Sequence, residues 1–394
     1  MRIIISIATV ALSVLASLLY AQTPGFVRGA DVSWCSEMEA AGKQFYNEAG
    51  VQTEMMALLR QCGLDAVRLR VWVNPEEAYG AWCDKVDVVA KARRAKTQGL
   101  AIMIDFHYSN FFADPSRQTT PSAWAALSLE GLKQAVGNHT TEILSALKDE
   151  GIEPAWVQVG NETRSGMLWD NGRIDWSKTT DAAKWAGYIA LSNAGYDAVK
   201  SVLPQAKVIV HIDKGPEDNV WFYKAFKQYG GKFDMIGLSH YPATDWKNEN
   251  AKTAANVKAL TAQFSVPVMI VETGYSASDE ALAGQVMTDF VDRLKALEQC
   301  VGVFYWEPEV YGWWKPEYYS KLGWNAYDKG AFTAQGRPAS AFKPFCGSPD
   351  AIAAPATTHD PSRSFDLAGR PVEAQRQGLF ITVKEKKAHK VLRR

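Results

Sequence analysis

The sequence has no net charge, because its 43 Lys and Arg side chains are balanced by 43 Asp and Glu side chains. A protein that binds nucleic acid needs an excess of basic side chains to neutralise phosphates. Long apolar runs are also absent after the first 21 residues. We therefore expect no nucleic-acid partner and no integral membrane span, and a neutral or weakly charged partner fits better.

Two kinds of site motif are missing as well. Metal-dependent barrel hydrolases need closely spaced ligands such as HxH, but the first strand offers only ADVSW and the six histidines are scattered. The same segment, GADVSW, is not the GxGxxG of a dinucleotide-binding turn. We therefore expect neither a metal nor a cofactor.

The first 21 residues, MRIIISIATVALSVLASLLYA, have one Arg, an apolar run and a small residue at the end. This pattern is typical of a secretory signal peptide that is cleaved after Ala21, which places the mature protein in the periplasm, on the cell surface or in the medium. The alternative is a membrane anchor, but the run is short and no stop-transfer charges follow it. An exported protein with five cysteines leaves at least one unpaired; the strand order below permits the pairs Cys300–Cys346 and Cys35–Cys83.

Residues 22–347 alternate apolar strands with helical periodicity. Strands are expected at 26–34, 64–72, 100–108, 156–160, 206–213, 233–242, 266–272 and 301–308. Helices are expected before 63, over 86–99, 123–150, 180–203, 219–230, 251–264 and 279–299, and towards 346. This α/β rhythm predicts a (β/α)8 TIM barrel, with an open doubly wound sheet as the alternative.

After residue 347 the composition changes. Residues 348–363 are rich in Ala, Pro, Ser and Thr and are typical of a linker. The basic tail, 364–394, has the pattern of a few small strands. It resembles short carboxyl-terminal appendages of exported Bacteroidetes proteins, which are associated with secretion or surface sorting; an exposed basic tail is the alternative.

Two glutamates end predicted strands. Glu162 closes WVQVGNE and Glu272 closes VPVMIVE. A carboxylate is costly at the end of a buried strand, so it usually has a task. The carboxyl ends of barrel strands share one face, and paired carboxylates there are typical of glycoside hydrolysis. The alternative is that each is a core carboxylate in a salt bridge.

The other strand ends carry polar and aromatic side chains that suit a sugar. They supply groups that bind hydroxyls and a ring that stacks on a sugar face. They are Asp31, Arg68, Arg70, His107, Asn161, His211, Asp213, His240, Tyr241 and Trp306.

Seven strings carry a specific resemblance. In order they are GADVSW, VRLRVWVNP, DFHYSNFFADPSRQTTPSAW, WVQVGNETRSGMLW, IGLSHYP, IVETGY and FYWEP, spanning about residues 26–346. They resemble glycoside hydrolase family 53, the endo-β-1,4-galactanases. The resemblance implies a retaining enzyme that cuts β-1,4-galactan, a side chain of pectin, internally into galactooligosaccharides.

The resemblance also implies roles for residues. Glu162 corresponds to the acid/base and Glu272 to the nucleophile, with Arg68 and Tyr241 keeping Glu272 ionised. Asn161 would bind the 2-hydroxyl of the sugar being cleaved. The remaining positions would support the site, orient hydroxyls or line the groove: Asp31, Arg70, Trp72, His107, Trp169, His240, Trp306, Trp313 and Trp314. Core or loop packing is the alternative for Trp72, Trp169, Trp313 and Trp314.

The sequence departs from the family in places. Asn110 and Phe111-Phe112 stand where an Asp and a Trp are common, and His240 stands where a Tyr is common, which puts subsite preferences in doubt. Some bacterial members hold a structural calcium ion, but no ligand set is recognisable here. We expect a monomer. The competing functions are a clan relative with another β-1,4-glycan substrate, a metal-dependent hydrolase and a noncatalytic carbohydrate-binding barrel.

Overall fold

The computed structural model describes residues 25–75, 79–174 and 180–346 with their side chains, together with the backbone of four strands between residues 363 and 393. The expected signal peptide and linker lie outside the described residues. The chain divides into two compact units, residues 1–346 and 347–394, and each is described by itself.

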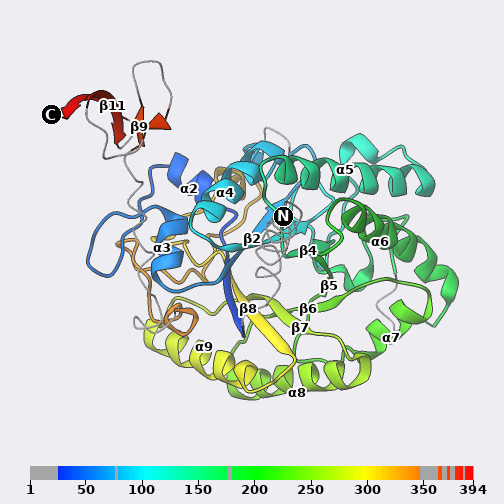
Figure 1. Cartoon of the computed structure of the whole chain (residues 1–394). Coiled ribbons are helices and arrows are strands. Elements are labelled where there is room, and N and C mark those ends of the chain that lie inside the picture. Colours follow the sequence, from blue (N-terminus) through cyan, green and yellow to red (C-terminus); the bar gives the residue numbers. More distant parts are fainter. Residues whose placement is uncertain are drawn as a thin grey trace, which may run out of the picture. The chain divides into compact units, whose positions relative to one another are not determined.

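The first unit is built on a closed barrel of eight strands, β1 to β8, in sequence order (Figure 1). Every neighbouring pair is parallel, including β1 with β8, so the predicted TIM barrel is confirmed. The strands are β1 Val27–Asp31, β2 Ala66–Val71, β3 Ala101–Phe106, β4 Trp156–Val159, β5 Lys207–Ile212, β6 Met235–His240, β7 Val268–Thr273 and β8 Cys300–Trp306.

Helices surround the strands (Figure 1). Several begin at a side chain that accepts a hydrogen bond from the first turn, as Asp84 does for α4 and Ser128 does for α5. The helices are α2 Cys35–Ala40, α3 Met55–Gln61, α4 Lys85–Thr97, α5 Leu129–Asp149, α6 Ala182–Val202, α7 Val220–Gln228, α8 Trp246–Phe264, α9 Glu280–Lys295 and α10 Glu317–Lys321, with the 3₁₀ turns η2 Ser122–Trp124, η3 Thr163–Ser165 and η4 Lys343–Phe345.

Two segments differ from the prediction. The short helix α2 follows β1 directly, where a loop was expected. The last helix, expected between the aromatic loop and Cys346, is reduced to the turn η4 in the described residues. The short helix α10 lies instead within residues 309–324, where a loop was expected.

The barrel interior has two layers. The lower layer is apolar and takes one or two side chains from each strand: Val27, Ala66, Met103, Trp156, Ile209, Met235, Met269, Val271 and Phe304. Gly29 leaves room for the Phe304 ring, since a Cβ there would lie 2.3 Å from it. Further along the same strands the inward positions become polar, and this upper layer forms the base of the candidate site.

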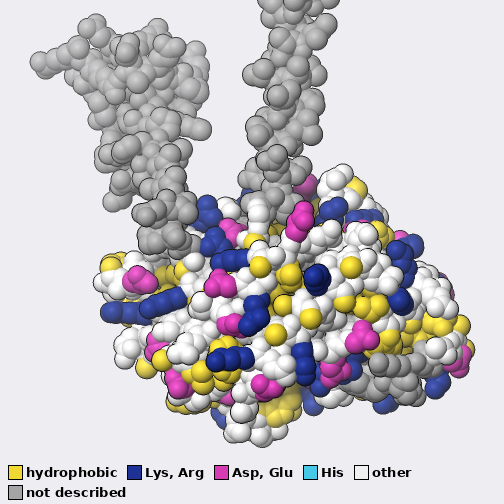
Figure 2. Space-filling view, turned by 90° about the horizontal axis from the view of Figure 1, so that it is seen from below, with side chains coloured by type: hydrophobic (Ala, Val, Ile, Leu, Met, Phe, Trp, Pro, Cys, Tyr) yellow, Lys and Arg dark blue, Asp and Glu magenta, His cyan; other side chains and the backbone are white. Residues whose placement is uncertain are grey.

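The surface of the first unit carries mixed charge. On the face seen in Figure 2, basic and acidic side chains are interspersed. Within the described residues, none of the helices combines the length and apolarity that a membrane crossing requires.

The cysteine pairs suggested by the strand order do not occur. All five thiols are free. The Cys346 thiol donates to the Phe342 carbonyl at 3.6 Å and lies beside Cys62, while Cys35, Cys83 and Cys300 are each buried. Burial raises the pKa of the Cys83 thiol to about 11, so this group is held in its unreactive form.

The second unit contains four strands in one sheet of order β10-β9-β11-β12. They are β9 Arg363–Phe365, β10 Pro371–Val372, β11 Gly378–Lys384 and β12 Lys387–Arg393, and each neighbouring pair is antiparallel. The small strands expected in the tail are therefore present.

Candidate active site

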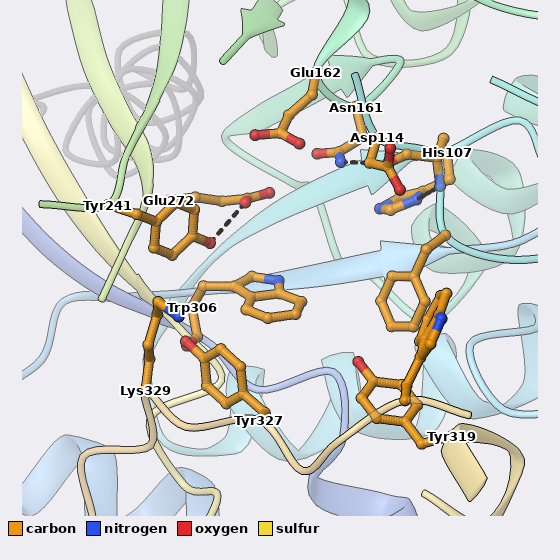
Figure 3. A pocket seen from close by; sticks show the side chains of 13 residues that line it. His107, Asp114, Asn161, Glu162, Tyr241, Glu272, Trp306, Tyr319, Tyr327 and Lys329 are labelled. Atoms are coloured by element: carbon orange, nitrogen blue, oxygen red, sulfur yellow. Dashed lines mark hydrogen bonds between the residues drawn. The ribbon is translucent and has the colours of Figure 1, made fainter. Parts of the chain in front are cut away.

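Glu162 and Glu272 line one cavity of about 470 Å³ at the carboxyl ends of the strands. Figure 3 shows the two carboxyl groups side by side above the Trp306 ring. The cavity is lined by His107, Phe112, Ala113, Asp114, Asn161, Glu162, Tyr241, Glu272, Trp306, Tyr319, Trp324, Tyr327 and Lys329.

Glu272 is held from two sides, as the sequence predicted. Arg68 Nη2 lies 2.8 Å from its Oε1, and the Tyr241 hydroxyl donates to its Oε2 at 2.9 Å. Burial raises the pKa of Glu272 to about 7, while Arg68 and the Tyr241 hydrogen bond oppose that rise. The carboxyl therefore ionises more easily than burial alone would allow.

Arg68 serves more than one carboxylate. It is fully buried and also contacts Asp31 at 2.6 Å and Asp105 at 2.8 Å. Burial disfavours the charge on Asp105, but Arg68 and His107 outweigh it and lower the pKa of Asp105 to about 2. The three carboxylates in turn raise the pKa of Arg68 despite its burial, so the guanidinium stays charged.

Glu162 follows β4 in a left-handed conformation, with φ 49° and ψ 50°. Non-glycine residues seldom adopt this conformation, and those that do are frequent at functional sites. Burial raises the pKa of Glu162 well above its usual value, and the charges of Glu272 and Asp213 raise it further. Glu162 is therefore the carboxyl of the pair that keeps its proton.

Asn161 and His107 lie beside the two glutamates. Asn161 accepts a hydrogen bond from Arg68 Nη2 at 2.9 Å and donates to the Ala113 carbonyl at 2.8 Å. His107 Nε2 lies 2.9 Å from Asp105, and its Nδ1 accepts from the Ala113 amide at 2.9 Å. These contacts fix both side chains at the cavity wall.

Aromatic rings that line the cavity pack against one buried residue, Trp34. Trp34 packs against Trp306 with ring centroids 5.3 Å apart, and against Phe112 at 6.0 Å and Tyr319 at 5.6 Å. The rings of Trp306 and Tyr327 meet edge-on at 4.8 Å. Trp306 therefore presents a fixed ring to the cavity.

Several lining residues were not identified from the sequence. Tyr319, Trp324, Tyr327 and Lys329 all come from the segment after β8. The density of aromatic residues in that segment was the available signal, but it did not show which rings point inward. Asp114, from the loop after β3, was also missed.

Four of the predicted groove residues do not line this cavity. Trp72 is 1% exposed and packs on Phe111 and Phe112. Trp169 donates to the Ser165 carbonyl, Trp314 packs on Trp34, and Trp313 is 70% exposed. The packing alternative is therefore the correct one for Trp72, because the Phe pair covers it.

Arg70 and His240 also lie elsewhere. Arg70 is buried under Phe112 and pairs with Glu307 at 2.9 Å. His240 is 1% exposed, its ring lies 4.5 Å from that of Phe290, and its Nε2 lies 2.8 Å from Asn250 Oδ1. The prediction that His240 orients hydroxyls or the acid is wrong, because alternation along β6 turns it into the helix layer.

A calcium or other metal centre has no matching ligand set in the described part of the chain, since no three His, Cys, Asp or Glu side chains group there as ligands.

The chain is similar in sequence to known proteins over most of its length. Over 252 residues the chain is 39% identical to a Niallia circulans protein described as an uncharacterized protein in the bgaB 5' region, covering 64% of this chain and 68% of that one. It is 31% identical over 333 residues to the arabinogalactan endo-beta-1,4-galactanase of Cellvibrio japonicus, covering 77% and 86%.

Among solved structures, that of a fungal beta-1,4-galactanase superposes with a TM-score of 0.70 at 28% identity, covering 82% of this chain and 99% of the other. The catalytic domain of an Ignisphaera aggregans member superposes with a TM-score of 0.71, also at 28% identity. The sequence profile of Glycosyl hydrolase family 53 matches residues 27–345. The chain belongs to Glycosyl hydrolase family 53.

Proposed function

We propose that the protein is an endo-acting, retaining hydrolase of β-1,4-galactosidic bonds in galactan. The observation that carries this proposal is the pair Glu162 and Glu272 across one cavity, with Arg68 and Tyr241 bound to Glu272. Retention requires carboxyl groups about 5 to 5.5 Å apart, so that one attacks the sugar directly.

In the first step Glu272 attacks the anomeric carbon. Arg68 and Tyr241 support its ionised form, and Trp306 supplies the apolar floor beneath the sugar. Glu162 gives its proton to the departing glycosidic oxygen, so the glycosidic bond breaks as the ester bond to Glu272 forms. The raised pKa of Glu162 supports this role, because the acid must hold its proton until then.

In the second step the ester is hydrolysed. Glu162, now ionised, takes a proton from water, and the resulting hydroxide attacks the anomeric carbon. Glu272 leaves as a carboxylate, and Glu162 is again protonated. Asn161 is placed to donate to the 2-hydroxyl, since one hydrogen of its amide is not used by Ala113.

The choice of galactan rests on relatives. The Cellvibrio japonicus protein and the fungal structure are named as β-1,4-galactanases. Pectic galactan is the substrate class we infer from those names. The equal numbers of acidic and basic residues agree with a neutral polymer.

Product analysis tests the substrate. The purified protein is incubated with β-1,4-galactan and, separately, with arabinan, mannan and cellulose. We expect short galactooligosaccharides of several lengths from galactan alone. Release from another polymer would replace the substrate assignment, and release of galactose alone would contradict endo action.

Two further measurements test the mechanism. Proton NMR of the first product should show the β anomer before mutarotation, whereas an α anomer means inversion. Glu272→Gln should lower kcat by roughly 10⁴-fold or more. A noncatalytic binding protein would have no turnover to lose and would keep its affinity for galactan in this variant.

We also propose that residues 1–21 direct export and that the protein is a monomer. The support for export is the signal-peptide pattern of the amino terminus. Amino-terminal sequencing of the mature protein should begin at residue 22. Light scattering during size-exclusion chromatography should give the mass of one chain; a larger mass would contradict the monomer.

A further inference from the structure

Ser239 lies between the two glutamates. Its hydroxyl oxygen is 3.5 Å from Glu272 Oε2, and it lies close enough to the Glu162 carboxyl to lower the pKa of that group. Strand pairing places Ser239 directly opposite Glu272, and the register between β6 and β7 shifts between Leu238 and Ser239. Such irregularities re-aim a side chain next to an active site, so one hydroxyl meets both carboxyl groups.

His211 holds this hydroxyl from behind. Its Nε2 lies 2.8 Å from Ser239 Oγ. Its Nδ1 faces two donors, the Gln158 amide nitrogen at 2.9 Å and the Glu162 backbone N–H at 3.3 Å. It also faces one acceptor, Asn161 Oδ1, at 3.0 Å. The Gln158 amide is oriented by Arg68, which donates to its oxygen at 2.6 Å. Because two of the three groups around Nδ1 are donors, we infer that Nδ1 accepts and that the imidazole carries its hydrogen on Nε2.

The protonation of His211 decides which group donates in the hydrogen bond between His211 and Ser239. Burial lowers the pKa of His211 well below its usual value, and the charge of Arg68 lowers it further. A neutral ring with its hydrogen on Nε2 donates to Ser239 Oγ. The hydrogen of Ser239 is then free to point at a carboxylate, and the two nearby are Glu162 and Glu272.

We propose that Ser239, fixed by His211, is a positioning residue whose hydrogen bond moves from Glu272 to Glu162 during the reaction. This inference rests on the proposed function. In the free enzyme Glu272 carries the negative charge, and the hydroxyl donates to it. Once the ester forms, Glu162 carries the charge, and the same hydroxyl rotates to donate to Glu162. No proton leaves Ser239.

Other charged or titratable groups act on the same two carboxyls and stay unchanged when Ser239 is replaced. On Glu272 they are Arg68, Asp105, Asp31 and Tyr241, and on Glu162 they are Asp213, Asp114 and Glu272 itself.

The test is Ser239→Ala beside Ser239→Thr and Thr273→Val. Ser239→Thr keeps a hydroxyl. Thr273→Val is the matched control, since the Thr273 hydroxyl is buried next to Glu272 in the chain and has no hydrogen-bond partner in the described structure. Each variant is assayed for kcat/KM against pH, and for kcat on an aryl galactobioside whose good leaving group makes the second step limiting.

Loss of the donor should raise the pKa of the ionised carboxyl in each step. In Ser239→Ala we expect the acid limb of kcat/KM to move up by roughly half to one pH unit. On the aryl substrate kcat should fall roughly 10-fold. In Ser239→Thr the acid limb of kcat/KM and the kcat on the aryl substrate should both lie between those of Ser239→Ala and the wild type. Thr273→Val should match the wild type in both measurements.

Two outcomes would overturn the inference. The first is an unchanged pH profile in Ser239→Ala with a uniform loss of activity, which is what a purely structural hydroxyl would give. The second is an equal shift in Thr273→Val. Neither outcome bears on the galactanase assignment, because that is tested on the wild type and on Glu272→Gln.

Discussion

Arg68 reaches Glu272 with the same nitrogen that it offers to Asp105: Nη2 lies 2.8 Å from Glu272 Oε1 and 2.8 Å from Asp105 Oδ2. The other terminal nitrogen is taken by Asp31. One guanidinium thus contacts Asp31 and Asp105 while it supports a third carboxylate, Glu272, whose charge changes during the reaction.

Arg68→Lys tests this geometry. A lysine keeps the charge but cannot reproduce the planar set of donors. We expect kcat/KM on galactan to fall roughly 10²-fold, with a folded protein by circular dichroism. Activity within twofold of the wild type would mean that charge alone suffices at this position.

Glu162→Ala separates the two halves of the reaction. Without the acid, galactan cleavage should fall by roughly 10³-fold, because its leaving group needs a proton. An aryl galactobioside with an acidic phenol should still form the ester, and added azide should then restore turnover as a β-galactosyl azide product. Equal loss on both substrates would contradict the acid role.

The pH profile should report the raised pKa values. Activity requires ionised Glu272 and protonated Glu162, and burial raises the pKa of the first to about 7 and that of the second well above its usual value. The acid limb of kcat/KM should therefore lie near neutrality. Tyr241→Phe removes a hydrogen bond to the ionised form of Glu272. The acid limb of kcat/KM should therefore move up by roughly one pH unit. A limb near pH 4 in the wild type would contradict this reasoning.

A second buried carboxyl pair should control stability. Glu307 and Glu309 are both fully buried, and neither carboxyl oxygen of Glu309 has a hydrogen-bond partner in the described structure, so a charge on Glu309 is disfavoured there. Burial, then the charge of Glu307, raises the pKa of Glu309 well above its usual value. A raised folded-state pKa gives stability that is complete below the unfolded-state pKa and is lost as the pH rises above it.

Glu309→Gln removes this titratable carboxyl. From about pH 5 upward the free energy of unfolding should fall less steeply in the variant than in the wild type, by up to about 1.4 kcal/mol per pH unit. Urea unfolding at several pH values measures the slopes. Glu130→Gln, at a side chain 66% exposed, is the control. Identical slopes in wild type and Glu309→Gln would mean that Glu309 does not keep its proton in the folded state.

Replacing Trp72 and replacing Trp313 should have very different effects on the free energy of unfolding. Trp72 is 1% exposed and Trp313 is 70% exposed. Trp72→Ala should lower the free energy of unfolding by about 3–5 kcal/mol, and Trp313→Ala should change it by less than about 0.5 kcal/mol. Urea denaturation distinguishes them. A large loss in Trp313→Ala would mean that its ring packs in solution.

The strands and both glutamates could be predicted because each strand repeats one simple rule. Inward positions alternate, so Arg68 and Arg70 on β2, or Asp31 on β1, could be placed on the inner face from spacing alone. The same rule placed His211 on β5 among the candidates, and applied to β3 it would have added Asp105. It would also have removed His240, because Ser239 and Tyr241 take the inward positions on β6.

The cavity wall after β8 could not be predicted in the same way. Tyr319 lies on the short helix α10, and Trp324 and Lys329 lie on irregular backbone, where side chains follow no period. Their places depend on contacts between distant segments, such as Arg117 over the Trp324 ring at 5.4 Å and the Tyr305 hydroxyl on the Lys329 carbonyl at 2.8 Å. A single sequence does not reveal such pairings.

The reacting groups and much of the cavity wall come from different parts of the chain, the strand ends and the segment after β8, and this separation has an evolutionary consequence. The reacting groups are anchored in the barrel frame, whereas much of the wall that meets the glycan belongs to residues 317–329. Insertions or exchanges in that stretch can therefore alter which polysaccharide is accepted while the bond-breaking apparatus is inherited intact.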